Sequence, residues 1–91
     1  MAKKDVKVSF SGRTISVDKK KVQPKLNDDT VDWSGPQQYT IVMPGGQQIP
    51  ATQQGGQWLA SAGPWNALQN IKYDITAPNH DTLDPDIEVV P

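Results

Sequence analysis

Alternating apolar and polar residues predict β-strands along most of the chain. Two clear runs flank a polar, Pro-containing loop near the C-terminal end, the first holding Tyr73 and Ile75 and the second Ile87 and Val89. In each run every second residue is apolar, which is the period of a strand with one buried face. Residues 73–90 therefore predict two strands on either side of a loop.

The same pattern predicts a first hairpin and two central strands. Residues 6–10 and 15–17 alternate on both sides of a Ser-Gly pair, which is typical of two strands joined by a short turn. Residues 30–33 place Trp33 on an apolar face, and residues 39–43 are the most apolar run of the chain. We expect these two segments to be central strands and Trp33 to be a core residue.

Three other segments break the alternation. Residues 18–27 are basic and contain Pro24, so they fit an edge strand or a crossover better than a central strand. Residues 47–57 are rich in Gln, Gly, Thr and Pro without periodicity, which predicts a mobile loop with short strand fragments at its ends. Residues 64–70 begin with a proline at the first helical position, and they form the one helix that the sequence predicts.

Length and composition favour one small all-β domain. A chain of 91 residues buries roughly 60–65% of its unfolded surface, which is enough for one modest core and a single domain spanning residues 1–91. Only 35% of the residues are hydrophobic, and eight prolines and seven glycines accompany them. This composition suits many short strands joined by turns.

Charge and hydropathy bear on partners and location. Nine basic and ten acidic side chains give a net charge of −1, so little counterion-release energy is available and we expect no binding of nucleic acid. Lysines cluster at residues 3–7 and 19–25; they could steer a charged partner, but lysines that guard strand edges are the simpler interpretation. No segment is apolar enough for a signal peptide or a membrane span, which favours a soluble, cytoplasmic protein.

Two tryptophans and two glutamines form the first group of candidate ligand-binding residues. Trp58 and Trp65 lie in or beside a Gln- and Gly-rich stretch that also holds Gln53 and Gln54. Exposed indole rings there could stack on a sugar or hold an apolar ligand. The alternative, which we favour from the sequence, is that the rings form an apolar plug at one open end of the domain.

Asn79 and His80 form the second candidate group. His80 lies beside Asp81 and near Asp84, and a histidine with carboxylates on a loop can ligate zinc or a harder divalent ion. One imidazole without a second imidazole or a thiol makes a poor metal site, and a solvated loop with local turns is the favoured interpretation. We therefore predict no metal site and no cofactor.

The sequence predicts that the protein is not an enzyme. One histidine and no cysteine leave only a Ser-His-Asp triad, and no serine lies in a G-x-S-x-G elbow. The glycine pairs at 45–46 and 55–56 lack the strand-to-helix context of a phosphate-binding loop.

The order of these segments resembles the cupredoxin-like family. The most specific local piece is the turn and strand Asn27-Asp28-Asp29-Thr30-Val31-Asp32-Trp33, and the next is Tyr73-x-Ile75 leading to a loop and a terminal strand. The resemblance covers the layout of most of the chain. It implies a small Greek-key β-sandwich of about seven strands, to which the pattern adds one short helix.

The copper ligands of that family do not carry over to this chain. A blue-copper site needs two imidazoles, a thiolate and a weak axial thioether. The resemblance places the first His, the Cys, the second His and the axial Met at or near these positions: Gln38 and Tyr39, Thr76, Asn79 or His80, and Leu83. We therefore expect a member of the family that lacks the copper ligands and forms no blue-copper centre.

The sequence thus predicts a non-catalytic binding or protein-interaction module for an unknown protein or small ligand. Loops on a rigid sandwich commonly carry recognition, so we expect residues 47–65 and 78–85 to form the binding surface. One alternative is a metal-handling or electron-transfer protein related to copper-binding cupredoxins. A second alternative is a structural subunit that assembles through a sheet edge, and the sequence leaves the oligomeric state open.

Overall fold

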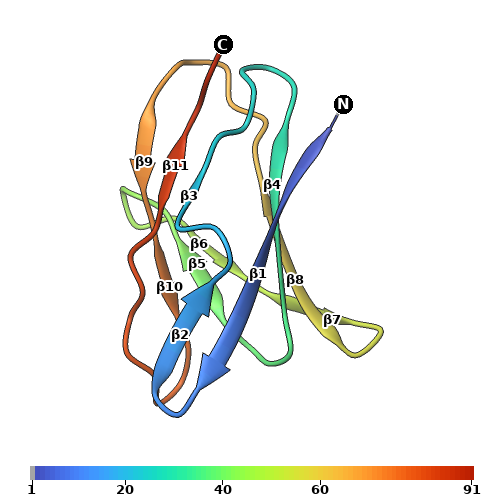
Figure 1. The fold of residues 1–91 in the computed structure, drawn as a ribbon, viewed down its shortest axis with the longest axis vertical. Helices are drawn as coiled ribbons and strands as arrows, with labels where there is room; N and C mark the ends of the chain where they lie inside the picture. Colours follow the sequence, from blue (N-terminus) through green and yellow to red (C-terminus); the bar gives the residue numbers. More distant parts are fainter. Residues whose placement is uncertain (1) are drawn as a thin grey trace.

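The structure, a computed structural model, describes residues 2–91 and is all-β, as predicted (Figure 1). Within these residues the chain forms eleven strands in three sheets and no helix. The strands are β1 Lys3–Ser11, β2 Thr14–Val17, β3 Lys21–Val22, β4 Thr30–Gly35, β5 Thr40–Val42, β6 Gln48–Pro50, β7 Thr52–Gln54, β8 Gln57–Ala62, β9 Asn70–Lys72, β10 Asp74–Thr76 and β11 Asp86–Glu88.

The sheets form two layers of a β-sandwich-like fold. One layer is the five-stranded sheet, in the order β2-β1-β4-β8-β7. The other contains the sheets β10-β5-β6 and β3-β11-β9, which are joined because the Tyr73 N–H donates to the Pro85 carbonyl and Ile75 exchanges two hydrogen bonds with Leu83. Residues 70–88 thus form a bent hairpin that runs through both three-stranded sheets, in agreement with the strands predicted within residues 73–90.

Strand β1 is shared between two partners. Its second half pairs antiparallel with β2, which confirms the predicted first hairpin, and its first half pairs parallel with β4. The open side of that first half is covered by polar contacts from the following segment. The Lys7 N–H donates to Asp18 Oδ1 at 2.8 Å, and the Lys19 ammonium donates to the Asp5 carbonyl.

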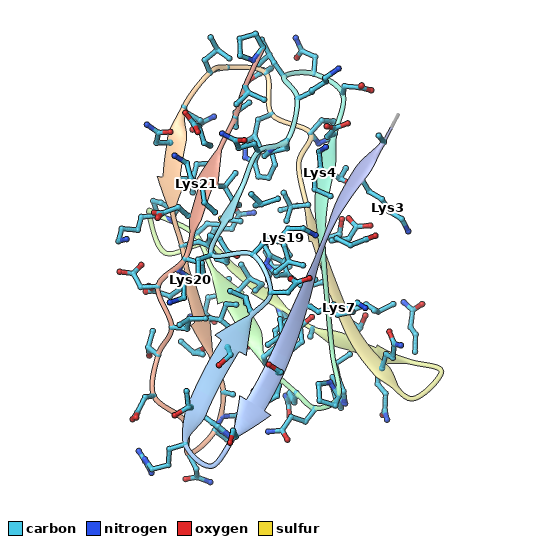
Figure 2. All side chains as sticks on the ribbon, in the orientation of Figure 1. Lys3, Lys4, Lys7, Lys19, Lys20 and Lys21 are labelled. Carbon is cyan, nitrogen blue, oxygen red and sulfur yellow. The ribbon has the colours of Figure 1, made fainter. Side chains whose placement is uncertain are left out.

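The lysine clusters lie along strand edges. Lys3, Lys4 and Lys7 follow the first half of β1, and Lys19 to Lys21 lead into the edge strand β3 (Figure 2). Charged side chains on an edge discourage pairing with another chain. This placement agrees with the interpretation that the lysines prevent pairing at strand edges. The edge position of β3 agrees with the prediction that residues 18–27 form an edge strand or a crossover.

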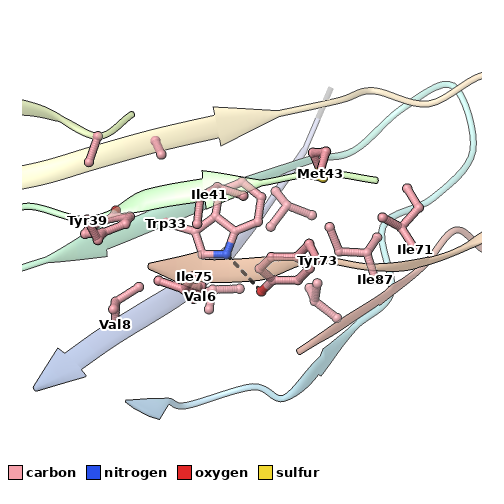
Figure 3. Packing of buried hydrophobic residues seen from close by; sticks show 14 of the residues in the cluster. Val6, Val8, Trp33, Tyr39, Ile41, Met43, Ile71, Tyr73, Ile75 and Ile87 are labelled. Carbon is pink, nitrogen blue, oxygen red and sulfur yellow. Dashed lines mark hydrogen bonds between the residues drawn. The ribbon is translucent and has the colours of Figure 1, made fainter. Parts of the chain in front are cut away.

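The core is built around a tryptophan and a tyrosine from opposite layers. Trp33 of β4 is 0% exposed and Tyr73, between β9 and β10, is 1% exposed. The Trp33 Nε1–H donates to the Tyr73 hydroxyl at 3.0 Å, and the rings meet edge to face with centroids 5.3 Å apart (Figure 3). Val6 and Ile75 complete this contact between the layers and are also fully buried. The prediction that Trp33 is a core residue is confirmed.

Burial of the tyrosines predicts a loss of stability at alkaline pH. Burial raises the pKa of Tyr73 to about 12, although the hydrogen bond from Trp33 lowers it in part, and burial also raises the pKa of Tyr39. The folded protein therefore holds these protons more tightly than the unfolded chain. We expect the free energy of unfolding to be unaffected by these groups below about pH 10 and to fall as pH rises toward 12, by about 1.4 kcal/mol per pH unit for each tyrosine.

Urea unfolding between pH 9 and 11 measures this fall, and absorbance at 295 nm follows tyrosine ionisation. The variant Tyr73→Phe controls for lysines and surface ion pairs, which titrate in the same range, and it should show a shallower fall. Ionisation of both tyrosines near pH 10 in a protein that stays folded would contradict the prediction.

Residues 47–57 do not form the predicted loop, although the strand fragments expected at its ends are present as β6 and the start of β8. Strand β6 pairs with β5 in one layer, and β7 pairs with β8 in the other. Between them Ala51 is 6% exposed, and its N–H donates to the Tyr39 carbonyl at 3.0 Å. The sequence shows no alternation here because β7 has no buried face and β6 has only one half-buried residue, so backbone pairing defines the strands.

The predicted helix at residues 64–70 is also wrong. The Trp65 carbonyl accepts from the Asn27 N–H and the Gln69 carbonyl accepts from the Val89 N–H, each at 2.8 Å, so the backbone is anchored to distant segments. A helix of two turns is too short to be stable without an apolar face that packs, and Leu68 is 57% exposed. The described residues also form more strands than the expected seven. Some stretches that read as one strand in the sequence are divided in the structure, and the stretch around Tyr73, for example, forms β9 and β10.

Candidate functional site

The larger cleft, here named the outer cleft, lies on the outward face of the five-stranded sheet. It has a volume of about 570 Å³. Most of its lining comes from alternate positions of β1, β4, β8 and β7, and the other face of β1, β4 and β8 is turned to the core. The lining residues are Lys3, Asp5, Asp32, Trp33, Ser34, Ile49, Pro50, Thr52, Gln54, Gln57, Leu59, Ala60 and Ser61.

A row of polar side chains crosses the outer cleft. Asp5, Asp32 and Ser61 are register partners on three neighbouring strands. Asp32 Oδ1 accepts hydrogen bonds from Ser61 Oγ at 2.8 Å and from Thr30 Oγ1 at 3.1 Å. These hydroxyls offset part of the repulsion that two carboxylates on adjacent strands produce. The row offers strong acceptors to the hydroxyl or amide groups of a ligand.

The second cleft, here named the Trp65 cleft, has a volume of about 420 Å³ and is lined by uncharged residues only among those described. They are Met43, Pro44, Gln47, Ile49, Ser61, Ala62, Gly63, Trp65, Gln69 and Ile71. Gly63 has a φ of 88°, and a Cβ there would lie 2.7 Å from Trp65 Cζ3, so only glycine lets the indole ring lie this close to the backbone.

The two clefts are adjacent. Ile49 of β6 and Ser61 of β8 line both of them, and together we name the two clefts the paired clefts. The outer cleft lies on the outer face of the five-stranded sheet, and the Trp65 cleft lies beside it where β6 faces β8. The change of layer between β6 and β7, which the sequence pattern did not predict, therefore places the two clefts side by side.

The structure separates the first group of predicted site residues. Gln54 lines the outer cleft and Trp65 lines the Trp65 cleft. Gln53 and Trp58 are register partners on β7 and β8 but line neither cleft. Trp58 is half-buried against the core, and its carbonyl accepts from the Tyr39 hydroxyl at 2.9 Å.

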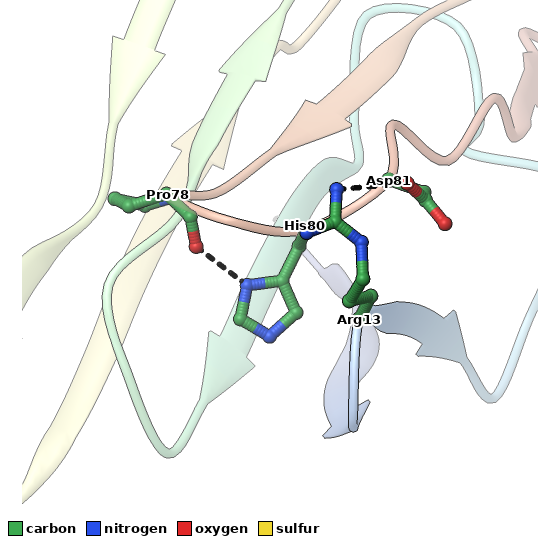
Figure 4. A network of polar contacts seen from close by, with 4 residues as sticks. All are labelled: Arg13, Pro78, His80 and Asp81. Atoms are coloured by element: carbon green, nitrogen blue, oxygen red, sulfur yellow. Dashed lines mark hydrogen bonds and ion pairs between the residues drawn. The ribbon is translucent and has the colours of Figure 1, made fainter.

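Asn79 and His80 lie on the loop between β10 and β11 and line neither of the paired clefts. Figure 4 shows His80 with Pro78, Asp81 and Arg13. His80 Nδ1 is 2.7 Å from the Pro78 carbonyl, which can only accept, so Nδ1 carries the proton. The imidazole also meets Phe10 edge to face at 5.2 Å. The Asp81 N–H donates to the Arg13 carbonyl at 2.8 Å, which ties this loop to the turn between β1 and β2.

A buried carboxylate escaped the sequence prediction. Asp29, which belongs to a predicted turn, is 2% exposed. Its Oδ2 accepts from the Lys25 N–H at 2.9 Å and lies 4.0 Å from the Lys4 ammonium, while Oδ1 has no hydrogen-bond partner among residues 2–91. A side-chain acceptor that closes a turn is the signal that could have located it. Asp29 holds the turn that leads into β4.

Comparison with known proteins does not place the chain in a family. No family model matches the sequence, and no curated protein matches it. Within residues 2–91, no three His, Cys, Asp or Glu side chains are grouped so that they could hold a metal ion. The same residues contain no helix that is long and apolar enough to cross a membrane. The function is therefore inferred from the geometry of the paired clefts.

Proposed function

We propose that the protein is a non-catalytic binding module on a copper-free, cupredoxin-like Greek-key sandwich, and that its ligand occupies the paired clefts. The observation that carries the proposal is the adjacency of the two clefts, which share Ile49 and Ser61 in their linings. Their volumes of about 570 and 420 Å³ fall within the range of ligand-binding pockets. Apolar side chains with a few polar groups are the usual lining of such pockets.

The groups available in the paired clefts suit binding. Asp5 and Asp32 supply acceptors, and Leu59 and Ile49 supply apolar surface. The single histidine of the chain, His80, lies outside the clefts and is bonded to Pro78. A bound molecule would therefore be held by hydrogen bonds and apolar contact.

A variant at the junction of the clefts tests the proposal. Ser61→Arg places a long side chain at a position that lines both clefts, and we expect it to weaken ligand binding by about tenfold or more because the side chain fills space that the ligand needs. Ligands are selected from a phage-displayed random dodecapeptide library and from a panel of neutral hexasaccharides, and binding is followed by chemical shifts of backbone amides.

The matched control is Ser16→Arg, since Ser16 is an exposed serine on β2 of the same sheet and lines neither cleft. This variant should bind like the parent protein. Ligands whose shifts map to the loop around His80, or ligands that tolerate Ser61→Arg, would contradict the proposed location.

A second candidate function is assembly through a sheet edge. Strand β7 is an edge of the five-stranded sheet, and its residues Thr52–Gln54 carry no charge, in contrast to the lysine-flanked edge strand β3. Edges without charged residues are open to pairing with another chain. A sedimentation coefficient that rises with protein concentration would favour this function over a monomeric binding module.

A further inference from the structure

The Trp65 ring forms part of the wall of a solvent-open cleft. It is only half-buried, with one part held against the backbone at Gly63. Its indole N–H has no hydrogen-bond partner among the described residues. An indole in this setting offers a flat surface with a negative π face and an unused donor at its rim. Both features suit a ligand that has C–H groups on its faces and acceptors around its edge.

The polar groups beside Trp65 have unused hydrogen-bonding capacity. Gln47 and Gln69 each carry two amide donors and one carbonyl acceptor. No residue that the structure describes bonds to the Gln47 amide, and the Gln69 amide reaches only the Ala67 carbonyl, at 3.4 Å. Hydroxyl groups both donate and accept, so one amide can satisfy several of them. The lining of the Trp65 cleft is uncharged, so a charged ligand would find no opposite charge there. The cleft therefore favours a neutral ligand.

The outer cleft continues the same chemistry. Its lining adds the amides of Gln54 and Gln57 and the hydroxyl of Thr52 to the carboxylate row. Because the cleft lies on a sheet face, the backbone groups of β1, β4 and β8 below it are already paired with one another. Apart from the free edge of β7, a ligand there meets side chains rather than unpaired backbone groups, whereas an extended peptide gains most of its affinity from backbone pairing at a sheet edge.

We propose that the paired clefts bind a neutral oligosaccharide, with one pyranose ring stacked on Trp65 and its hydroxyls bonded to Gln47, Gln69 and Ser61. The following sugars of the chain extend into the adjacent outer cleft, where the glutamine amides donate to and accept from further hydroxyls and the carboxylates accept from them. This inference rests on the proposed binding function of the same site and names its ligand class.

The probes are neutral hexasaccharides, namely cellohexaose, xylohexaose, mannohexaose and maltohexaose, added separately to ¹⁵N-labelled protein. We expect at least one to bind with a Kd below about 10 mM, and to shift the Trp65 indole N–H and the Gln47 side-chain amide. Hexagalacturonate, which carries a negative charge on every ring, should bind more weakly, because the outer cleft holds two carboxylates, Asp5 and Asp32, against one ammonium, that of Lys3.

Two pairs of variants define the contacts. Trp65→Ala should weaken binding by about tenfold or more, and Trp65→Phe, which keeps an apolar ring and guards against a loss of folding, should retain part of it. Gln47→Ala should weaken binding by about three- to tenfold. Gln53→Ala is the matched control, since Gln53 is an exposed glutamine outside both clefts, and it should leave binding unchanged.

The outcomes separate this inference from the proposed function. If no hexasaccharide shifts the cleft resonances but selected dodecapeptides do, the sugar inference is wrong and the binding module stands. If neither class of probe binds in the paired clefts, both are wrong. Sugar binding that survives Trp65→Ala in a folded variant would place the site elsewhere and would also overturn the inference.

Discussion

Replacing Trp33 with alanine is expected to lower the free energy of unfolding by about 3–5 kcal/mol, the usual cost of deleting a large buried aromatic side chain. Trp33 is 0% exposed and lies between the two layers. Its removal leaves a cavity, and it also deprives the Tyr73 hydroxyl of the indole donor. A domain of this length has a total stability of about 5–14 kcal/mol, so a large share of it would be lost.

Urea unfolding followed by circular dichroism measures this loss. The control is Trp58→Ala, which removes a tryptophan that is only half-buried and should cost less. Trp33→Phe should fall between the parent and the alanine variant, because it keeps most of the packed surface. A Trp33→Ala variant with the parent's urea midpoint would mean that Trp33 lies outside the core and that the two faces of β4 are reversed.

Alternation of apolar residues predicted the faces of the strands but not their partners. It located the hairpin at β1 and β2, the strand with Trp33 and the buried positions of Tyr73 and Ile75. It could not show that β1 and β4 pair in parallel, because a face pattern is the same for any neighbour. Pairing is decided by contacts between residues distant in sequence.

Where a strand has no buried face, the pattern carries no signal. Residues 52–54 are exposed throughout, yet they form β7 because their backbone pairs with β8. At residues 64–70 the proline suggested a helix start, but the carbonyls of Trp65 and Gln69 bond to other segments. Local propensity was overridden by tertiary hydrogen bonds at both places.

The candidate site was predictable only in part. The composition around Trp65 and Gln54 suggested ligand contacts, and both residues line the paired clefts. Ile49 and Ser61 lie within residues 47–65, which the sequence predicted as binding surface, but nothing singled them out, since their importance comes from the place where β6 approaches β8. A cleft between strands of different layers depends on the whole fold, whereas a motif depends on a short stretch of sequence.

The variant Tyr73→Phe should lower the free energy of unfolding by about 1–3 kcal/mol although it removes a single oxygen atom. The ring would still fill its space in the core, so little packing is lost. The Trp33 indole N–H, fully buried, would lose the acceptor that now lies 3.0 Å away. A buried donor left without a partner costs the free energy of its lost hydration.

Tyr39→Phe is the matched control for this prediction. The Tyr39 hydroxyl donates to the Trp58 carbonyl at 2.9 Å. Removing this hydroxyl therefore takes one hydrogen bond from a carbonyl acceptor, whereas Tyr73→Phe leaves a buried N–H donor with no partner. Carbonyls with a lone pair unused are tolerated more readily than orphaned N–H groups, and we expect the smaller loss here.

A double-mutant cycle isolates the bond between Trp33 and Tyr73. In Trp33→Phe the indole N–H is already absent, so adding Tyr73→Phe should cost less than it does in the parent protein, and the two losses should not sum. Urea unfolding of the four proteins gives the coupling free energy directly. Strictly additive losses would show that the indole–hydroxyl bond contributes nothing to stability and that packing alone joins the two layers at this point.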